Sequence, residues 1–349
     1  MKQIEISDFG GPEQLQVREA AEPAVGPGEV LVRVAFAGLN PLDHKLRDGS
    51  SGKASHLTMP AVLGRELSGT VIGAAEDVDL EALAMPVGTA VFGMRAMDDW
   101  RGTYSEVVAI PAGCLAPVRA LPTGVPDTAA VPDADALAPW GGLALAGLTA
   151  LIAVRDCARV SRGDTVLIHG GAGGVGQMLI PLAREAGAAQ IWATGRAENA
   201  ARIRELGAEA IAYDEQDWEV VLDEATAGRG ADVILDTHYF ATFAPSLEHL
   251  ADGGRIVVLP TLADLSPAKD RGIEAHIPQL EVSRERLDHL AAGLESGAID
   301  VEIAQILPMD QIADGHRILE SGHSRGKLLL DLRGENPQAP GKRAARSEA

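Results

Sequence analysis

The sequence predicts an α/β protein that combines a β-rich domain with a doubly wound parallel sheet. Two observations point to this fold class. Residues 1 to about 120 contain short β segments separated by glycine- and proline-rich turns, whereas strand and helix patterns alternate after about residue 122. At 349 residues, the chain is long enough for one or two domains with sizeable cores, and therefore for an enzyme.

The β-rich part is predicted from five apolar segments at short spacing. They are "QLQV", "EVLVRVAFAG", "LSGTVIG", "GTAVFGM" and "YSEVVAI". Short strands with turn residues between them are typical of a small, mostly antiparallel barrel or sandwich.

The central part is predicted from the alternation of strands with helices. The elements in order are "TVLIHG", a helix over 174–187, "QIWATG", a helix over 197–206, "EAIAY", "ADVILDT", a helix over 243–251 and "GRIVVLP". Because these strands are almost entirely apolar, they indicate a parallel sheet that is covered on both faces. The pattern changes again near residue 298, through "IDVEIAQILPM", a helix near 310–321 and "GKLLLDL".

The composition argues against several classes of protein. A formal net charge of −20 repels polyphosphate backbones and anionic lipid, so we expect neither a nucleic acid nor a membrane partner. We expect no export signal and no run of about 18 uncharged apolar residues. The two cysteines, Cys114 and Cys157, argue against a disulfide framework. We therefore expect a cytoplasmic protein that acts on a small molecule, and a solvated tail at "GKRAARSEA".

A glycine-rich stretch between a strand and a helix predicts a nucleotide site. In "VLIHGGAGGVGQ", Gly171, Gly173 and Gly176 satisfy the G-x-G-x-x-G pattern, and Gly174 and Val175 are expected to begin the helix. A dinucleotide pyrophosphate needs a tight turn, close backbone approach and a helix N-terminus with free N–H groups. The alternative is a tight turn without a ligand.

The end of the next strand favours NADP(H) over NAD(H). Enzymes that use NAD place a carboxylate there for the ribose 2′-hydroxyl, whereas "QIWAT" ends in Thr194, Gly195 and Arg196. A guanidinium pairs well with a 2′-phosphate, and Thr194 could add a hydroxyl. In the alternative, Arg196 is solvated and Glu198 binds the ribose.

Other users of such a glycine loop fit less well. A short-chain dehydrogenase needs a Tyr-x-x-x-Lys pair, and no tyrosine of this chain has Lys four residues later. A methyltransferase remains a distant alternative, because it would want an acidic ribose partner and would leave the β-rich part unexplained.

A series of blocks runs along the chain in the order "FGGPEQLQV", "GPGEVLVRV", "GLNPLDHKLRDG", "LGRELSGTV", "VGTAVFGM", "GTYSEVV", "GLTA", the glycine loop, "RELGAE", "GGRIVVL" and "SGHSRGKLLLDL". Together, these blocks resemble the medium-chain dehydrogenase/reductase superfamily, and specifically its zinc-independent quinone oxidoreductase-like branch. The resemblance covers about residues 1–333 and implies a GroES-like catalytic domain over 1–121 and 298–333, a Rossmann domain over 122–297, and a homodimer or higher homo-oligomer. The composition of residues 334–349 predicts a flexible tail.

The chain departs from this family at two places. Zinc-dependent relatives have Cys near the position of Leu42 and His at the position of Arg65, and the cysteine-rich zinc lobe is absent, so we expect no metal. Relatives usually have Val-Gly-Gly after the strand "ADVILDT", where this chain has His238 and Tyr239. These two side chains either stand near the cofactor ribose or replace glycine as packing.

The resemblance also suggests residues for the reaction. It places Asn40 beside the nicotinamide and the substrate oxygen, Thr149 near the nicotinamide, and Gly326 and Lys327 near the cofactor; a strand-edge charge is the alternative for Lys327. Lys45 would stabilise or protonate an enolate if it is buried; the alternative is an ion pair with Asp43 or Asp48. Tyr104 either lines the cleft or fills the barrel.

Without a metal as Lewis acid, a substrate that stabilises its own product anion is preferable. The sequence therefore predicts an enzyme that transfers hydride from NADPH to a quinone or to the activated C=C bond of an α,β-unsaturated carbonyl compound. Two alternatives stay open: an enoyl-thioester reductase, and a nucleotide-binding protein without turnover.

Overall fold

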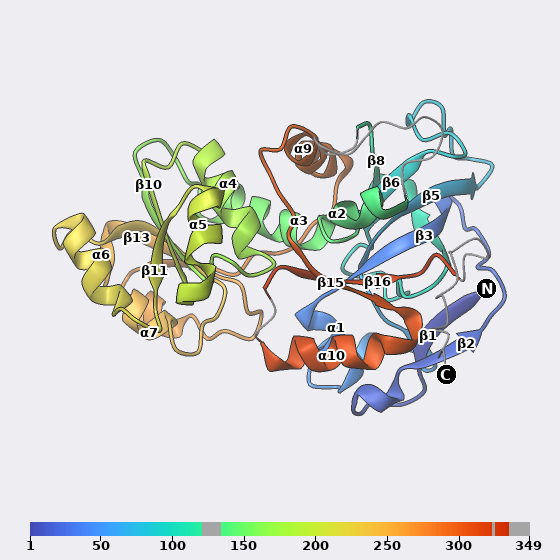
Figure 1. Cartoon of the computed structure of the whole chain (residues 1–349), viewed down its shortest axis with the longest axis horizontal. Helices are drawn as coiled ribbons and strands as arrows, with labels where there is room; N and C mark the ends of the chain where they lie inside the picture. The colour runs from blue at the N-terminus through green and yellow to red at the C-terminus, as the bar shows by residue number, and fades with distance from the viewer. Residues whose placement is uncertain (121–133, 323–324, 335–349) are drawn as a thin grey trace, which may run out of the picture.

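The computed structural model describes residues 1–120, 134–322 and 325–334. The chain forms two lobes with helices between them (Figure 1). One lobe contains the N-terminal strands together with the last two strands, and the other contains a parallel sheet from the central part. The predicted fold class is confirmed. The predicted domain limit at 121/122 and, apart from Gly334, the predicted tail over 334–349 lie outside the described residues.

The β-rich lobe contains two sheets. The first has the order β2-β1-β4, with β1 (Lys2–Ile6), β2 (Gln16–Glu19) and β4 (Ala61–Val62). The second has seven strands in the order β15-β16-β3-β5-β6-β8, with β7 paired to β3. Its bounds are β3 (Glu29–Leu39), β5 (Glu66–Ala74), β6 (Ala90–Met94), β7 (Val107–Pro111), β8 (Leu115–Pro117), β15 (Ile303–Pro308) and β16 (Lys327–Asp331). Two helices, α1 (Pro41–Arg47) and α10 (Ile312–Ser321), pack on each other in this lobe.

The parallel-sheet lobe has six strands in the order β11-β10-β9-β12-β13-β14. They are β9 (Thr165–His169), β10 (Gln190–Gly195), β11 (Glu209–Ala212), β12 (Ala231–Asp236), β13 (Leu250–Val258) and β14 (Glu274–His276), and every pairing is parallel. Numbered from β9, this is the order 3-2-1-4-5-6 of dinucleotide-binding sheets, which places the ligand crevice between β9 and β12 at their carboxyl ends.

The apolar strands are buried because helices cover both faces of this sheet. In β9, Val166 and Ile168 belong to one core cluster and Leu167 to another, as the alternation of side chains along a strand requires. The helices of the parallel-sheet lobe and its junction are α2 (Ala138–Gly141), α3 (Ala144–Ile152), α4 (Gly176–Glu185), α5 (Ala200–Leu206), α6 (Trp218–Thr226), α7 (Phe243–Ser246), α8 (Ser266–Asp270) and α9 (Arg284–Glu295).

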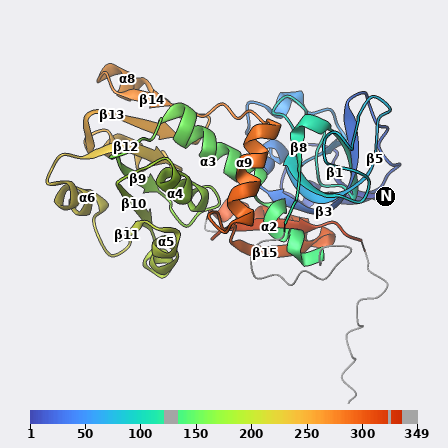
Figure 2. The ribbon, with the colours of Figure 1, turned by 90° about the horizontal axis from the view of Figure 1, so that it is seen from above.

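Helices α3 and α9 pack against each other between the two lobes (Figure 2). The surrounding segment Asp135–Cys157 is, by length and composition alone, long and apolar enough to cross a membrane, so the expectation that the chain has no long apolar run was wrong. Its most apolar stretch is 83% buried inside the structure, as in the core helix of a folded domain. Its apolar composition thus follows from contacts with both lobes.

Several element boundaries also differ from the prediction. The predicted helix over 243–251 is only the short α7 (Phe243–Ser246), because β13 begins at Leu250, and the predicted helix over 197–206 begins with a turn of 3₁₀ helix over Ala197–Asn199. The sequence analysis did not identify α3, α6, α9, β1 or β14. The strand β14 (Glu274–His276) is three residues long and contains two polar side chains, so it carries no apolar signal.

Candidate active site at the junction of the lobes

The glycine loop, residues 170–176, connects β9 to α4 at the carboxyl edge of the parallel sheet. A Cβ atom on Gly176 would lie 2.0 Å from the carbonyl oxygen of Gly170, and one on Gly171 would lie 2.7 Å from Cβ of Ala193. Larger residues at these places would push the turn apart. At Gly173, a Cβ atom would meet only the carbonyl oxygen of Gly170, at 3.3 Å. The outer side of the loop is therefore bare backbone, which fits a pyrophosphate at the N-terminus of α4.

The helix after the loop begins later than predicted. Gly174 and Val175 were expected to open it, but α4 starts at Gly176 and Val175 is the residue before its first turn. The carbonyl of Val175 accepts the N–H groups of Met178 and Leu179. Gly174 and Val175 thus form the last part of the loop, where their backbone remains next to the predicted phosphate position.

Thr194 and Arg196 occupy different environments at the end of β10. Thr194 is buried, and its hydroxyl accepts the N–H of Gly170 at 3.1 Å, so it supports the glycine loop from beneath. Arg196 is exposed, and its side chain has no hydrogen bond or ion pair with any described residue. The sequence analysis missed Tyr213, which is 48% exposed and whose N–H donates to the carbonyl of Gly195 at 3.0 Å. A cation without a partner among the described residues, one position after this backbone contact, suits a phosphate ester at this edge.

The returning C-terminal strand contacts the glycine loop. Gly326 forms an isolated parallel bridge with Gly173, and its N–H donates to the carbonyl of Ala172 at 3.3 Å. Gly326 has φ +78°, and a Cβ atom there would lie 2.4 Å from the carbonyl oxygen of Glu302. Only glycine fits this turn. The next residue, Lys327, begins β16 and so enters the β-rich lobe directly from the glycine loop.

Three buried polar side chains meet at this junction, and we call Asn40, Glu66 and Lys327 the lysine cluster. The ammonium of Lys327 donates to Oδ1 of Asn40 at 2.6 Å and to Oε1 of Glu66 at 2.8 Å. The same Glu66 oxygen accepts Nδ2 of Asn40 at 2.9 Å. The three residues are 4%, 0% and 2% exposed for Lys327, Glu66 and Asn40 respectively. Such burial of two charges is tolerated because each has its counter-charge and further hydrogen bonds.

The first turn of α3 also holds the lysine cluster. The N–H of Leu145 donates to Oε2 of Glu66 at 2.8 Å, so both carboxylate oxygens are bonded. Thr149, one turn further along, donates its hydroxyl to the carbonyl of Leu145 at 2.8 Å and is half-buried. The cluster therefore joins β5, β16, the residue before α1, and α3.

A second buried layer lies beneath Asn40. The N–H of Asn40 donates to Oδ2 of Asp43 at 2.8 Å, and the hydroxyl of Tyr104 donates to the same oxygen at 2.9 Å. Burial raises the pKa of Asp43 to about 6, against the lowering effect of these hydrogen bonds. Tyr104 is fully buried in the core of the β-rich lobe, so of the two placements considered it fills the barrel. Its hydroxyl is linked to Asn40 by the carboxylate of Asp43, which accepts hydrogen bonds from both residues.

Lys45 does not meet the condition set for a proton donor. It is exposed on α1, so the burial that this role required is absent, and it forms no ion pair with Asp43 or Asp48 among the described residues. The structure therefore shows neither the buried proton donor nor the ion pair that was considered for Lys45. The other cation considered, Lys327, is buried in the lysine cluster, so it is not an exposed charge at a strand edge.

Arg65, which stands where the resemblance puts a zinc-binding histidine, holds a loop of its own lobe. Its buried guanidinium donates to the carbonyls of Ala96 and Asp99 and lies 5.2 Å from the ring centroid of Trp100. No group of three or more His, Cys, Asp or Glu side chains in the described parts of the chain could hold a metal ion.

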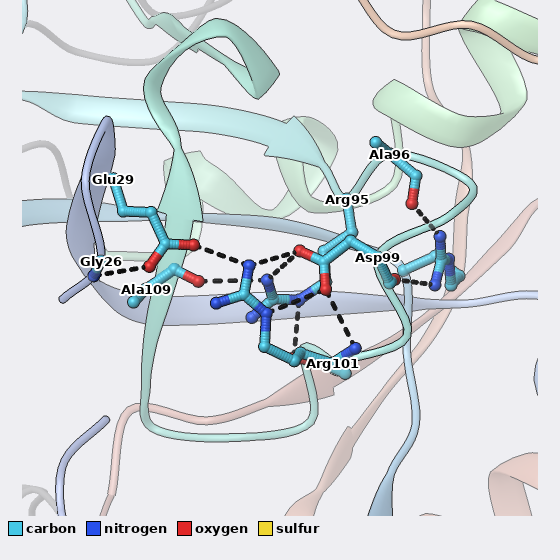
Figure 3. Close-up of polar contacts among 9 residues, drawn as sticks. Gly26, Glu29, Arg95, Ala96, Asp99, Arg101 and Ala109 are labelled. Atoms are coloured by element: carbon cyan, nitrogen blue, oxygen red, sulfur yellow. Dashed lines mark hydrogen bonds and ion pairs between the residues drawn. The ribbon is translucent and has the colours of Figure 1, made fainter. Parts of the chain in front are cut away.

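A network of arginines fixes the rest of that loop, residues 95–102 (Figure 3). The carboxylate of Asp99 pairs with Arg95 and with Arg101, both at 2.8 Å, and Arg101 also pairs with Glu29 at 2.6 Å. Burial alone would raise the pKa of Asp99, but the hydrogen bonds and charges of the two arginines lower it to about 2. The loop lines a cavity of about 480 Å³ whose other wall includes Leu280, Glu281 and Val282, beyond the parallel sheet.

Comparison with known proteins shows what this arrangement is similar to. Residues 26–120 match the alcohol dehydrogenase GroES-like domain family, and residues 206–330 match the zinc-binding dehydrogenase family. The quinone oxidoreductase structure from Coxiella burnetii is 30% identical with a TM-score of 0.82, covering 95% of this chain and 99% of that one.

Two further relatives extend this comparison. The quinone oxidoreductase of Escherichia coli, solved in complex with NADPH, is 27% identical with a TM-score of 0.79, covering 95% of this chain and 100% of that one. A 2-haloacrylate reductase from a Burkholderia species is 28% identical, covering 93% of this chain and 97% of the relative.

Proposed function

Because this chain belongs to the medium-chain dehydrogenase/reductase superfamily, in its zinc-independent quinone oxidoreductase-like branch, we propose that it uses NADPH to reduce quinones or α,β-unsaturated carbonyl compounds. Membership makes the chain an oxidoreductase with a nicotinamide cofactor. Membership in this family of oxidoreductases does not favour the alternative of a nucleotide-binding protein without turnover. The choice of NADPH and of the acceptor class is the proposal.

The lysine cluster is the observation that carries this proposal. A lysine ammonium has three N–H groups, and within the described structure Lys327 uses two of them, for Asn40 and Glu66. The remaining N–H has no partner among the described residues, and Lys327 lies one residue from the contact with the glycine loop at Gly326. A fixed cation in a buried site stabilises charge that develops on oxygen much better than water does.

The proposed reaction is a conjugate reduction. Bound NADPH would supply the hydride, which reaches the β carbon of the acceptor while the C=C electron pair moves toward the carbonyl oxygen. Lys327 donates a hydrogen bond to that oxygen as it becomes an enolate, Asn40 and Glu66 keep the ammonium in place, and water supplies the proton for the α carbon. A quinone takes up hydride and proton in the same way and leaves as the hydroquinone.

Arg196 supports the choice of NADPH. It is exposed, without an ionic partner in the described residues, at the end of β10 where a ribose phosphate would lie. We expect Arg196→Ala to weaken NADPH binding by roughly 10- to 100-fold and to leave NADH binding unchanged, because one charge-assisted hydrogen bond contributes about 1.5–3 kcal/mol. Equal losses for both cofactors would contradict the assignment.

The acceptor class is tested by steady-state rates with purified, chelator-treated protein. The acceptors are benzoquinones, naphthoquinones, cyclic and linear enones, an enoyl-thioester and simple ketones, each with NADPH or NADH. We expect turnover with NADPH on quinones or enones and none on simple ketones. Turnover confined to the thioester would favour the enoyl-thioester alternative, and nicotinamide oxidation with none of the acceptors would contradict the proposal.

We also propose that the protein is a cytoplasmic homodimer or higher homo-oligomer that acts on small molecules, without metal, nucleic acid or membrane. The short edge strand β14 has a partner on one side only among the described strands, so that side is open to a second copy. Size-exclusion chromatography with light scattering measures the oligomeric state, and a monomer at micromolar concentration would contradict this part.

A further inference from the structure

The segment after β12, residues 237–240, follows the carboxyl end of that strand at the crevice between β9 and β12, and it carries bulky side chains on a tight turn. Tyr239 has φ +73°, a left-handed conformation that favours glycine. The buried carboxylate of Asp236 holds it, because Oδ1 accepts the N–H groups of His238 at 2.8 Å and Tyr239 at 2.9 Å. The hydroxyl of Tyr239 in turn accepts the N–H of Asp264 at 2.9 Å. The turn that glycine would form is therefore kept, with bulky side chains on it.

This turn brings the imidazole of His238 over the glycine loop. A Cβ atom on Gly170 would lie 2.9 Å from Nε2 of His238 and 2.5 Å from Oγ1 of Thr237. Thr237 is fixed in turn by a hydrogen bond to the carbonyl of His169 at 2.7 Å. His238 is exposed, and its side chain has no hydrogen bond to any described residue. The imidazole is thus placed beside the first residue of the loop, and no described residue accepts a hydrogen bond from its N–H.

The chemistry at this position is that of the cofactor. In a sheet of this order the dinucleotide crosses from the loop after β9 to the loop after β12, so its pyrophosphate and nicotinamide ribose pass the switch point between them. Arg196 lies on the other side of β9, at the end of β10, where the adenosine half would bind. We therefore expect His238 and Arg196 to contact different halves of the dinucleotide.

We propose that His238 is a further binding residue for the dinucleotide, whose imidazole N–H donates a hydrogen bond to an oxygen of the nicotinamide-side phosphate or of the nicotinamide ribose. This rests on the proposed function in that it needs a dinucleotide, but it applies to NADPH and NADH alike. Its signature follows from the geometry: His238 contributes to the part that both cofactors share, and Arg196 contributes to the 2′-phosphate.

The test measures dissociation constants of NADPH, NADH and adenosine 2′,5′-bisphosphate by titration calorimetry for wild type, His238→Ala and His238→Gln. His238→Ala should weaken the binding of NADPH and NADH by the same factor, about tenfold, and leave the binding of adenosine 2′,5′-bisphosphate unchanged, because this fragment lacks the nicotinamide-side phosphate of the pyrophosphate and the nicotinamide ribose. His238→Gln should recover part of the loss, because its amide can donate. Arg196→Ala should show the reverse pattern, weakening NADPH and the fragment but not NADH.

The matched control is His249→Ala, which removes an imidazole just before β13, at the opposite edge of the same sheet. It should leave all three dissociation constants unchanged. The inference is overturned if His238→Ala binds NADPH and NADH within twofold of wild type, or if its affinity for the fragment falls by the same factor. Wild-type protein that binds neither dinucleotide would overturn the inference together with the proposed function, whereas normal binding without turnover would leave only the acceptor proposal in doubt. Unchanged thermal unfolding of His238→Ala would exclude a fold defect, since the side chain has no hydrogen bond to lose among the described residues.

Discussion

Two full charges, on Glu66 and Lys327, lie inside this protein almost out of contact with solvent. Removing a charge from water is costly, and the pair recovers this cost only while both members and their hydrogen bonds are present. Glu66 accepts from Lys327, Asn40 and the N–H of Leu145. Each side chain of the lysine cluster therefore depends on the others.

The first prediction concerns this dependence. Lys327→Met leaves Glu66 as a buried carboxylate without a counter-charge, and we expect it to lower the free energy of unfolding by about 3–5 kcal/mol in urea titrations. The double variant Lys327→Met/Glu66→Gln, which removes both charges, should lose less than the single variant. The control Asp314→Asn breaks an exposed pair with Arg317 and should cost less than about 1 kcal/mol. A Lys327→Met protein as stable as wild type would contradict the account.

A second prediction follows from the pKa of Asp43, which is about 6 in the folded protein against 3.8 for an ordinary aspartate. Because the folded state holds this proton more tightly than the unfolded state, the contribution of Asp43 to stability is complete below about pH 4 and is lost as the pH rises through 6. Asp43→Asn cannot lose a proton. Its free energy of unfolding should therefore rise relative to wild type, on the order of 1–3 kcal/mol, between pH 4 and pH 7.

The measurement is urea unfolding of both proteins at several pH values. The control is Asp48→Asn, at the end of the same helix, where hydrogen bonds to Ser50 lower the aspartate pKa against the effect of burial. Its stability relative to wild type should not rise over this interval. A constant difference between Asp43→Asn and wild type from pH 4 to pH 7 would contradict the assignment.

At the scale of elements, the loop over residues 95–102 is held by side chains rather than by strand pairing. Arg65 bonds the carbonyls of Ala96 and Asp99 from beneath, and Arg95 bonds the carbonyls of Gly102 and Ala109. These guanidinium groups give the loop a fixed shape where it lines the cavity facing residues 280–282.

The third prediction is that Arg65→Met releases this loop while the rest of the lobe stays folded. Amide hydrogen exchange over residues 96–102 should quicken by about tenfold or more, because the carbonyls of Ala96 and Asp99 lose their buried donors. The control is Arg101→Met, whose side chain is 54% exposed and so contributes less. Exchange that is equally slow in Arg65→Met and wild type would show that backbone contacts alone hold the loop.

At the scale of the whole molecule, the fold followed from patterns along the chain, whereas much of the site did not. The apolar strands β9, β10 and β12 and the glycine loop are visible in the sequence because period and composition are local properties. The pairing of Glu66 with Lys327 joins residues 261 positions apart, so no local pattern contains it. The block "LGRELSGTV" contains Glu66 and the block "SGHSRGKLLLDL" contains Lys327, but only the folded chain shows that these two residues form a pair.

Exposure was the second property that the sequence did not supply. Lys45 and Tyr104 were both candidates for the cleft, yet one is exposed on α1 and the other is fully buried in the β-rich lobe. Lys45 lies on a short helix and Tyr104 in the loop before β7, and residue type alone does not say whether a polar side chain at such a place faces the core or solvent. The structure thus moves the candidate cation from Lys45 to Lys327.

The central claim, hydride transfer from NADPH to the β carbon of a conjugated acceptor, is tested most directly by the position of a label. The wild-type enzyme is supplied with NADPH deuterated at C4 and a cyclic enone, and the product is examined by NMR and mass spectrometry. The account predicts a saturated ketone with deuterium on the β carbon and a hydrogen from water on the α carbon. An allylic alcohol with deuterium on the former carbonyl carbon would contradict it.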